Sequence, residues 1–299
     1  MWIYLTLFSA LMLGIYDVCK KHALNRNAVL PVLFLSVLCG YIPMILVLII
    51  SRTAPDFAHQ LYLFVPEANA SEHAHIFIKA AIVSTSWTLA YFALKHLPIS
   101  IVSPIRASGP MWTMIGALIL FHERPVPMQW AGIAVVLASY FAFSVIGRSE
   151  GVVFHNNRWI TCIFLATLTG AGSALYDKHL LHQLHYEPML VQYWFSFYNT
   201  VLLGLLTAIF WWPKRAGFTL FRWRWSIPAI GLLLVIADIV YFHAVRHPEA
   251  LILIVSLVRR CSVVVSFVAG AIIFGEVNRR RKAWALAGVL AGVALIMLA

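Results

Sequence analysis

Ten long apolar runs follow one another along the chain, and each is long enough to cross a lipid bilayer as a helix. At a helical rise of about 1.5 Å per residue, roughly 20 apolar residues span the hydrocarbon core of a membrane. Of the 299 residues, 62% are hydrophobic and only 11% are charged, which is too little charge for the surface of a soluble fold. The expected spans are 2–24, 28–50, 76–97, 99–121, 127–147, 159–183, 188–212, 227–246, 250–274 and 282–299. The sequence therefore predicts an all-α integral membrane protein with ten transmembrane helices.

The two halves of the chain repeat short segments in the same order. IVSPIR (101–106) recurs as IVSLVR (254–259), and LILFHE (118–123) recurs as AIIFGE (271–276). Further matches keep this order, and the separation between partners stays at 150–156 residues, about half of the chain. Several matches in one order indicate an internal repeat.

Each half contains five of the expected spans, so the second half enters the membrane in the opposite sense to the first. The sequence thus predicts two inverted five-helix repeats, residues 1–147 and 159–299, joined by the connection 148–158. Inverted repeats are typical of secondary transporters, in which the two halves rock about a substrate site near the midplane.

The first repeat also carries a spaced motif. Pro110 precedes Glu123 by 13 residues, and Gly132 follows Glu123 by nine. In this spacing, and in its duplicated ten-span plan, the chain resembles the EamA branch of the drug/metabolite transporter superfamily. Members of that family commonly show a proline 13 residues before a Gly-Glu pair and then a glycine about nine residues on. The chain departs from the pattern at His122, where glycine is usual.

The second repeat keeps part of the motif. FGE (274–276) retains the Gly-Glu pair, but Val263 occupies the proline position and the next matching glycine is Gly288. The resemblance covers essentially the whole chain, and it implies the ten-helix duplicated fold of a membrane transporter.

Two arginines lie at matching places deep within apolar runs. Intramembrane arginine costs at least about 2.5–3.5 kcal/mol, so Arg106 and Arg259 are expected to face the bundle interior and to have partners. Small hydroxylated residues share their helical faces: Ser103 and Thr113 lie beside Arg106, and Ser256 and Ser266 lie beside Arg259. Two interpretations are compatible, namely walls of one substrate cavity and arginines that staple the bundle by pairing with internal carboxylates.

Aromatic side chains are expected to line the same cavity, with Trp87, Tyr91 and Tyr241 as the candidates. Asp238 lies in mid-span, and it either pairs with a deep arginine on another helix or stays protonated because of desolvation. In the second case it is the candidate for proton coupling, with His243 as a relay.

The other acids and the histidine run are expected to be structural. Asp17 and Asp177 lie near helix ends beside lysines, and local salt bridges are predicted for both. Glu123 and Glu276 are predicted to cap helix ends and orient the adjoining hairpins. The run of His179, His182 and His185 turns steadily round a helix, so no metal site is predicted, and no cofactor is expected.

The expected partners are membrane lipids and a small-molecule or lipid-linked substrate. The net charge of +11 comes from basic residues in the connections, often beside tryptophan, which is typical of headgroup anchors and not of nucleic-acid binding. Gly288 and Gly292 form a GxxxG motif that permits close helix contact, either within the chain or in a homodimer.

Orientation is predicted differently by charge and by family. Connections after the odd-numbered spans hold 14 Lys/Arg and those after the even-numbered spans hold four, so the positive-inside rule puts both termini outside the cytoplasm. The family resemblance implies the reverse. The expected location is the inner (plasma) membrane of a bacterium.

The deep charges suggest one function and leave an alternative in the same fold. Deep arginines favour a secondary transporter for a small anionic or zwitterionic metabolite, because guanidinium binds carboxylate or phosphate through two parallel bonds. Translocation of a lipid-linked anion, such as a polyprenyl phosphate or a glycolipid, is the alternative in the same fold. A membrane-embedded enzyme is not predicted, since the chain has no H-E-x-x-H motif and no nucleophile elbow. No ATP-binding G-x-x-x-x-G-K-[ST] motif occurs either, which argues against ATP-driven transport by this chain alone.

Overall fold

The computed structural model describes residues 1–96, 105–106, 108–147, 158–215, 219–262, 265 and 279–298. Regular structure in these ranges is helical throughout. The longer helices are α1 (Trp2–Leu24), α2 (Val29–Thr53), α4 (Ala70–His96), α7 (Pro127–Gly147), α8 (Arg158–Lys178), α9 (Pro188–Leu206), α10 (Ser226–Arg246) and α13 (Arg279–Met297). The shorter ones are α3 (Pro55–Gln60), α6 (Gly109–Leu120) and α11 (Ile252–Arg259).

Six helices of the described residues are long and apolar enough to cross a membrane. They lie within α1, α2, α4, α8, α9 and α10, where α8 and α9 are prolonged by π-helical turns. Three shorter apolar helices fall in α6, α7 and α13. The prediction of an all-α multi-pass membrane protein is confirmed. The expected runs 99–121 and 250–274 lie partly outside the described residues, and their described parts form the short helices α6 and α11.

Local sequence explains where several helices begin. α7 and α9 begin at Pro127 and Pro188, and Pro110 lies in the first turn of α6. At these positions the missing N–H of proline costs no hydrogen bond, and its fixed φ suits a helix start. The motif proline Pro110 therefore marks the point where α6 starts, directly after Arg106 and Ser108.

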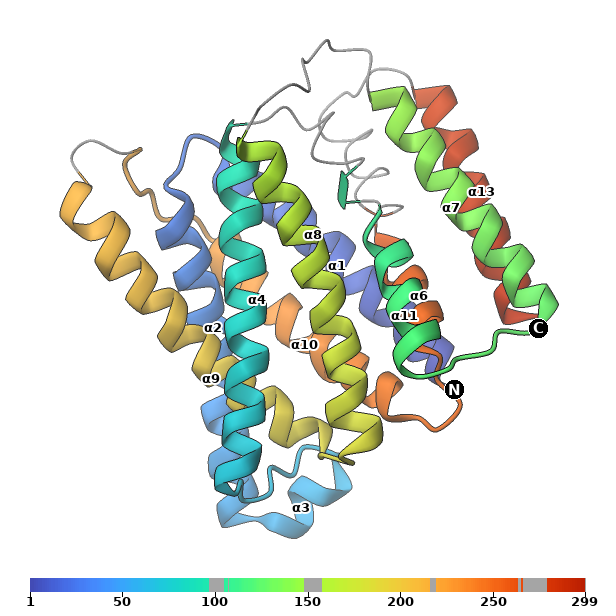
Figure 1. Cartoon of the computed structure of the whole chain (residues 1–299). Coiled ribbons are helices and arrows are strands. Elements are labelled where there is room, and N and C mark those ends of the chain that lie inside the picture. Colours follow the sequence, from blue (N-terminus) through green and yellow to red (C-terminus); the bar gives the residue numbers. More distant parts are fainter. Residues whose placement is uncertain are drawn as a thin grey trace.

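Helices of the first half pack mainly against helices of the second half. α1 packs along α10 and α4 packs along α8, while α2 contacts α10 and α4 contacts α9. α6 contacts α8 and α1 contacts α11, and α7 packs along α13. In Figure 1, α4 and α8 run side by side through the middle of the bundle, and α7 and α13 form a pair at one edge.

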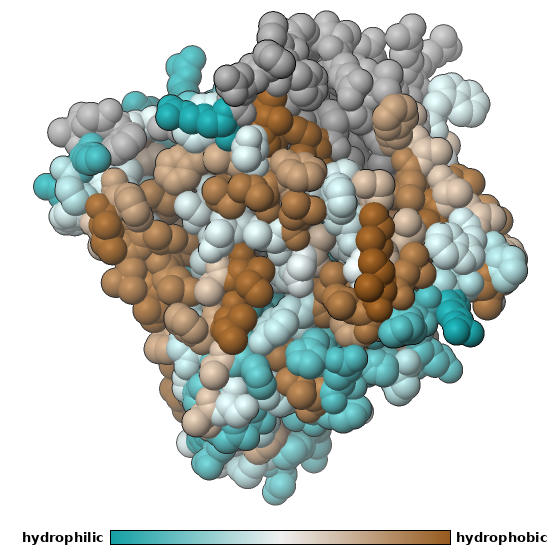
Figure 2. Space-filling model, in the orientation of Figure 1, coloured by the Kyte–Doolittle hydropathy of each residue, from teal (hydrophilic) through white to brown (hydrophobic). Residues whose placement is uncertain are grey.

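The outer face of the bundle is apolar over its middle. Large side chains such as Leu46, Leu205 and Ile209 are more than half exposed, as lipid contact requires. Figure 2 shows hydrophobic residues across the middle of one face and hydrophilic residues towards its lower end. The main buried apolar cluster lies inside, where Phe242, Leu253 and Leu181 join α10, α11 and the π-helical turn that follows α8.

Glycines let α7 and α13 approach closely. A Cβ added to Gly132 of α7 would lie 2.7 Å from the carbonyl oxygen of Gly292 in α13, and one added to Gly292 would lie 2.8 Å from that of Gly132. Gly288 lies against Ser139 of α7. The GxxxG motif thus makes its close contact within the chain, which is one of the two alternatives that the sequence left open.

We expect Gly292→Ala to destabilise the protein by about 1–3 kcal/mol, because the added methyl group overpacks the α7–α13 contact. Thermal unfolding of the purified protein in detergent measures the change. Gly172→Ala is the matched control, since Gly172 is exposed on α8 and a Cβ there meets nothing within 4 Å. Equal stability of the two variants would contradict the packing argument.

Candidate functional site

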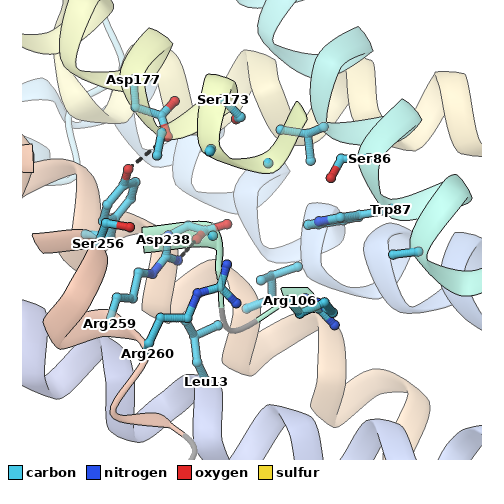
Figure 3. A pocket seen from close by; sticks show the side chains of 18 of the residues that line it. Leu13, Ser86, Trp87, Arg106, Ser173, Asp177, Asp238, Ser256, Arg259 and Arg260 are labelled. Atoms are coloured by element: carbon cyan, nitrogen blue, oxygen red, sulfur yellow. Dashed lines mark hydrogen bonds and ion pairs between the residues drawn. The ribbon is translucent and has the colours of Figure 1, made fainter. Parts of the chain in front are cut away.

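A cavity of about 250 Å³ lies inside the bundle. Helices from both halves of the chain form its wall, among them α1, α4, α8 and α10, together with the residues before α6 and after α11. Figure 3 shows Arg259 and Arg260 entering the cavity from one side and Arg106 and Trp87 lying on the other. A water-sized or larger polar solute therefore has room between charged groups in the interior of an apolar bundle.

Most residues predicted for the site lie around this cavity. The lining includes Arg106, Arg259, Ser256, Thr113, Trp87, Tyr91, Tyr241 and Asp238. Ser103 and Ser266 lie outside the described residues.

His243 does not line the cavity. Its Nδ1 is 2.8 Å from the carbonyl oxygen of Ile239 on the same helix. Five residues correspond to about 140° of rotation round a helix, so His243 points away from the face that carries Asp238. The predicted relay between these two side chains is therefore not formed in this structure.

The cavity also holds charged residues that the sequence did not assign to it. Five basic and three acidic side chains line it, and the unassigned ones are Lys20, Lys79, Arg260, Asp17 and Asp177. The position of Lys79 in the sequence already indicates that it faces the bundle interior. It lies within the predicted span 76–97, where a lysine is as costly as the two arginines. It has no basic counterpart in the second repeat, so a comparison of the two halves does not single it out.

Arg259 pairs with Asp238, so α11 and α10 are joined by a charge-assisted hydrogen bond from Nη2 to Oδ1. The Arg259 Cζ atom also lies 4.0 Å from the centre of the Tyr241 ring, a cation–π contact. Of the two predictions for Asp238, pairing with a deep arginine is the one that this structure contains. The Nε atom of Arg259 is buried without a hydrogen-bond partner among the described residues.

Asp177 pairs with Lys79 of α4, and the predicted local salt bridge with Lys178 is wrong. Both side chains of the pair are almost fully buried, at 5% and 3% exposure. The second carboxylate oxygen of Asp177 accepts a hydrogen bond of 3.1 Å from the hydroxyl of Tyr241. Successive residues of a helix point about 100° apart, so Asp177 faces α4 and α10 while its neighbour Lys178 faces elsewhere.

Lys178 instead binds Glu123, which follows α6. Its Nζ donates to Oε1 of Glu123 at 2.7 Å and to the carbonyl oxygen of Ala250 at 3.1 Å. Glu123 also accepts the N–H groups of Ile252 and Leu253, at 2.8 and 3.3 Å, and thereby caps the first turn of α11. The predicted capping role of Glu123 is confirmed, and its partner helix is α11. Glu276 lies outside the described residues.

The backbone of His122, the residue before Glu123, explains why glycine is usual at this position of the motif. His122 has φ of 52°, in the left-handed region that favours glycine. The turn at His122 directs the Glu123 side chain back towards α11. A histidine in this position retains the turn at some conformational cost.

Arg106 differs from Arg259 and Lys79 in having no carboxylate partner among the described residues. The ion pairs of the described residues include Arg259 and Lys79, but none includes Arg106. Lys20 contacts two aromatic rings, with Nζ 4.4 Å from the centre of Tyr91 and 5.3 Å from that of Tyr16. This side of the cavity therefore combines positive charge with aromatic faces.

The described residues contain no cluster of three metal-ligating side chains. In the histidine run, His179 and His182 belong to the π-helical turn His179–Gln183. The Nδ1 atom of His179 lies 2.5 Å from Oε1 of Gln183, and His185 has φ of 55° just beyond the turn.

We expect Glu123→Gln to destabilise the protein by about 3–5 kcal/mol, because it leaves the Lys178 charge buried without a counter-charge. The amide oxygen can still accept from Lys178 and from the Ile252 N–H, so the main loss is the charge, together with the longer hydrogen bond from the Leu253 N–H. Glu187→Gln is the control, since Glu187 pairs with Arg246 at half-exposed positions and its loss should cost less than about 1 kcal/mol. Thermal unfolding in detergent compares the two variants. Equal losses of stability would contradict the argument that burial makes the Glu123–Lys178 pair the more costly one to break.

We expect His122→Gly to stabilise the protein by up to about 1 kcal/mol, because glycine adopts a positive φ without strain. His122→Ala keeps a Cβ and should be the least stable of the three proteins. Unfolding temperatures of wild type and both variants test this order, and an alanine variant more stable than the glycine variant would contradict it.

Comparisons with known proteins agree with this architecture. Residues 1–145 match the EamA-like transporter family. A curated relative, the uncharacterized transporter sll1319 of Synechocystis sp., is 24% identical over 149 residues, which are 49% of this chain and 42% of the relative. The match therefore spans less than half of that relative's length. A solved crystal structure of 13% sequence identity superposes with a TM-score of 0.76, covering 99% of this chain and 96% of its own, and shows the fold alone.

Proposed function

We propose that the chain is a secondary transporter for a small anionic or zwitterionic metabolite, because residues 1–145 match the EamA-like transporter family and the described helices are those of a multi-pass membrane protein. The observation that carries the proposal is the cavity, in which five basic side chains and three acidic ones surround about 250 Å³ of space. An excess of positive charge in a low-dielectric interior attracts an anion strongly. Such a cavity in the middle of the bundle is where an alternating-access transporter holds its substrate.

The proposal includes two inverted repeats, residues 1–147 and 159–299, that rock about the cavity. Helix contacts support this arrangement because they recur when the halves are exchanged. The contact of α1 with α10 corresponds to that of α8 with α4, and the contact of α2 with α10 corresponds to that of α9 with α4. The cavity lies between helices of the two repeats, as rocking requires. We place the protein in the inner membrane of a bacterium.

In the proposed mechanism, Arg106 receives the anionic group of the substrate. No carboxylate of the described residues forms an ion pair with it, so its charge is available to a carboxylate or phosphate. Trp87 lies on the same side as Arg106 in Figure 3, and Tyr91 also lines the cavity, so both can give the rest of a small solute an apolar surface. Lys20 adds positive charge beside the Tyr91 ring.

Asp238 remains our candidate for proton coupling. It pairs with Arg259 in this structure, and a substrate anion that displaces it would require the carboxylate to be neutralised. A proton taken up on Asp238 meets that requirement and couples substrate movement to a proton gradient.

We expect Arg106→Gln to weaken substrate binding roughly 10- to 100-fold, the loss of one charge-assisted contact. A thermal-shift screen of carboxylates, amino acids and phosphate esters on purified protein identifies the metabolite, and its flux into proteoliposomes, with and without a pH gradient, tests transport. Arg52→Gln is the control, since Arg52 is exposed and its bond to Glu67 is long, at 3.6 Å. Flux that is absent for every metabolite that binds, or turnover of a lipid without flux, would refute the proposal.

A further inference from the structure

We propose that Lys79 and Asp177 form a second coupling site, in which Asp177 takes up a proton when an anionic group of the substrate replaces it on Lys79. The inference rests on the transport function proposed above and assigns a role to a residue pair that the family motif does not include. Both residues line the central cavity, Lys79 from α4 and Asp177 from α8.

The surroundings of Lys79 make Asp177 its essential partner. The lysine side chain is 3% exposed, and its Nζ lies 4.5 Å from the centre of the Phe195 ring and 4.9 Å from that of Phe242. Aromatic faces attract a cation but do not replace a counter-charge. Among the described residues, Asp177 is the one carboxylate within ion-pair distance of Lys79.

The pair can open only if both charges remain compensated. Removing one partner of a buried ion pair leaves an isolated charge in a medium that solvates it poorly. When a substrate carboxylate or phosphate binds Lys79, the released Asp177 must therefore become neutral. A proton from the aqueous phase that faces the cavity binds one Asp177 oxygen, and Lys79 keeps its own proton throughout. When substrate and proton leave on the other side of the membrane, the original pair forms again, so one proton crosses with each anionic group.

Tyr241 connects this pair to the second one in the cavity. Its hydroxyl donates to Asp177, while its ring lies against the guanidinium of Arg259, which pairs with Asp238. Figure 3 shows the hydrogen bond to Asp177 and the bond between Arg259 and Asp238 on adjoining parts of the cavity wall. A solute that contacts both Lys79 and Arg259 thus meets two cations that are each masked by a carboxylate.

The charged and titratable groups around Asp177 come from three neighbouring helices. Lys79 approaches from α4, Tyr241 and Asp238 from α10, and Arg259 from α11 through the Tyr241 ring. α6, which also packs on α8, contains no titratable side chain. Among these groups Lys79 is the one that pairs directly with Asp177, and Tyr241 holds the second carboxylate oxygen.

Infrared spectroscopy of the purified protein tests whether Asp177 becomes protonated when it loses Lys79. No substrate is needed, because a protonated carboxyl group has its own carbonyl stretch. In Lys79→Gln at neutral pH, Asp177 has lost its cation, and we expect a protonated-carboxyl band that wild type lacks. The band should shift in D₂O and disappear in the double variant Lys79→Gln/Asp177→Asn. Absence of the band in folded Lys79→Gln would overturn the proposal, since Asp177 would then keep its charge without Lys79.

Arg246→Gln is the matched control. Its partner Glu187 has a side chain that is 51% exposed, so water solvates the carboxylate and no new band is expected. If Lys79→Gln does not fold, wild type and Asp177→Asn are compared between about pH 8 and about pH 5. A carboxyl band that appears on acidification in wild type alone supports the site, and identical difference spectra overturn it. Neither measurement needs flux, so a failure of this site and a failure of the transport function are told apart.

Discussion

Asp177 and Lys178, adjacent residues of opposite charge near the end of α8, each pair with a different part of the bundle. Asp177 binds Lys79 of α4, and Lys178 binds Glu123 after α6, so α8 is joined on one side to α4 and on the other to the start of α11. Buried charges are tolerated only when they are paired and hydrogen-bonded, and each of these side chains is less than a tenth exposed. The relative positions of these helices, and with them the shape of the cavity, depend on both pairs being made at once.

The membrane itself explains why much of the fold is readable from the sequence. Lipid offers no hydrogen bonds, so apolar runs must be helices, and the described structure contains helices in the expected places. The interior positions of Arg106 and Arg259 are predictable for a related reason, since a deep arginine must face the interior, and both line the cavity. These predictions depend on what a residue type cannot tolerate, and that information is present in one sequence.

Partner choice was less predictable because it depends on how helices are packed. Asp177 was expected to bind its sequence neighbour Lys178, but a rotation of about 100° per residue sends the two side chains to different helices. His243 was linked to Asp238 by spacing, and the same rotation separates them. Lys79 lies within an apolar run, but its pairing with Asp177 follows only from the packing of α4 against α8. The charge pattern fixes which residues must be buried, and the three-dimensional packing decides which of them meet.

The shortness of α11 has a mechanical consequence. This helix is eight residues long, with its first turn held by Glu123 and its last residue being Arg259. At about 1.5 Å per residue it is a strut of roughly 12 Å that joins the connection after α6 to the wall of the cavity. A rigid strut transmits displacement, so any tilt imposed on the Glu123 end moves the Arg259 guanidinium relative to Asp238. A movement of the loop between α6 and α7 is thereby transmitted to the charged side chains of the cavity, although this loop does not line the cavity itself.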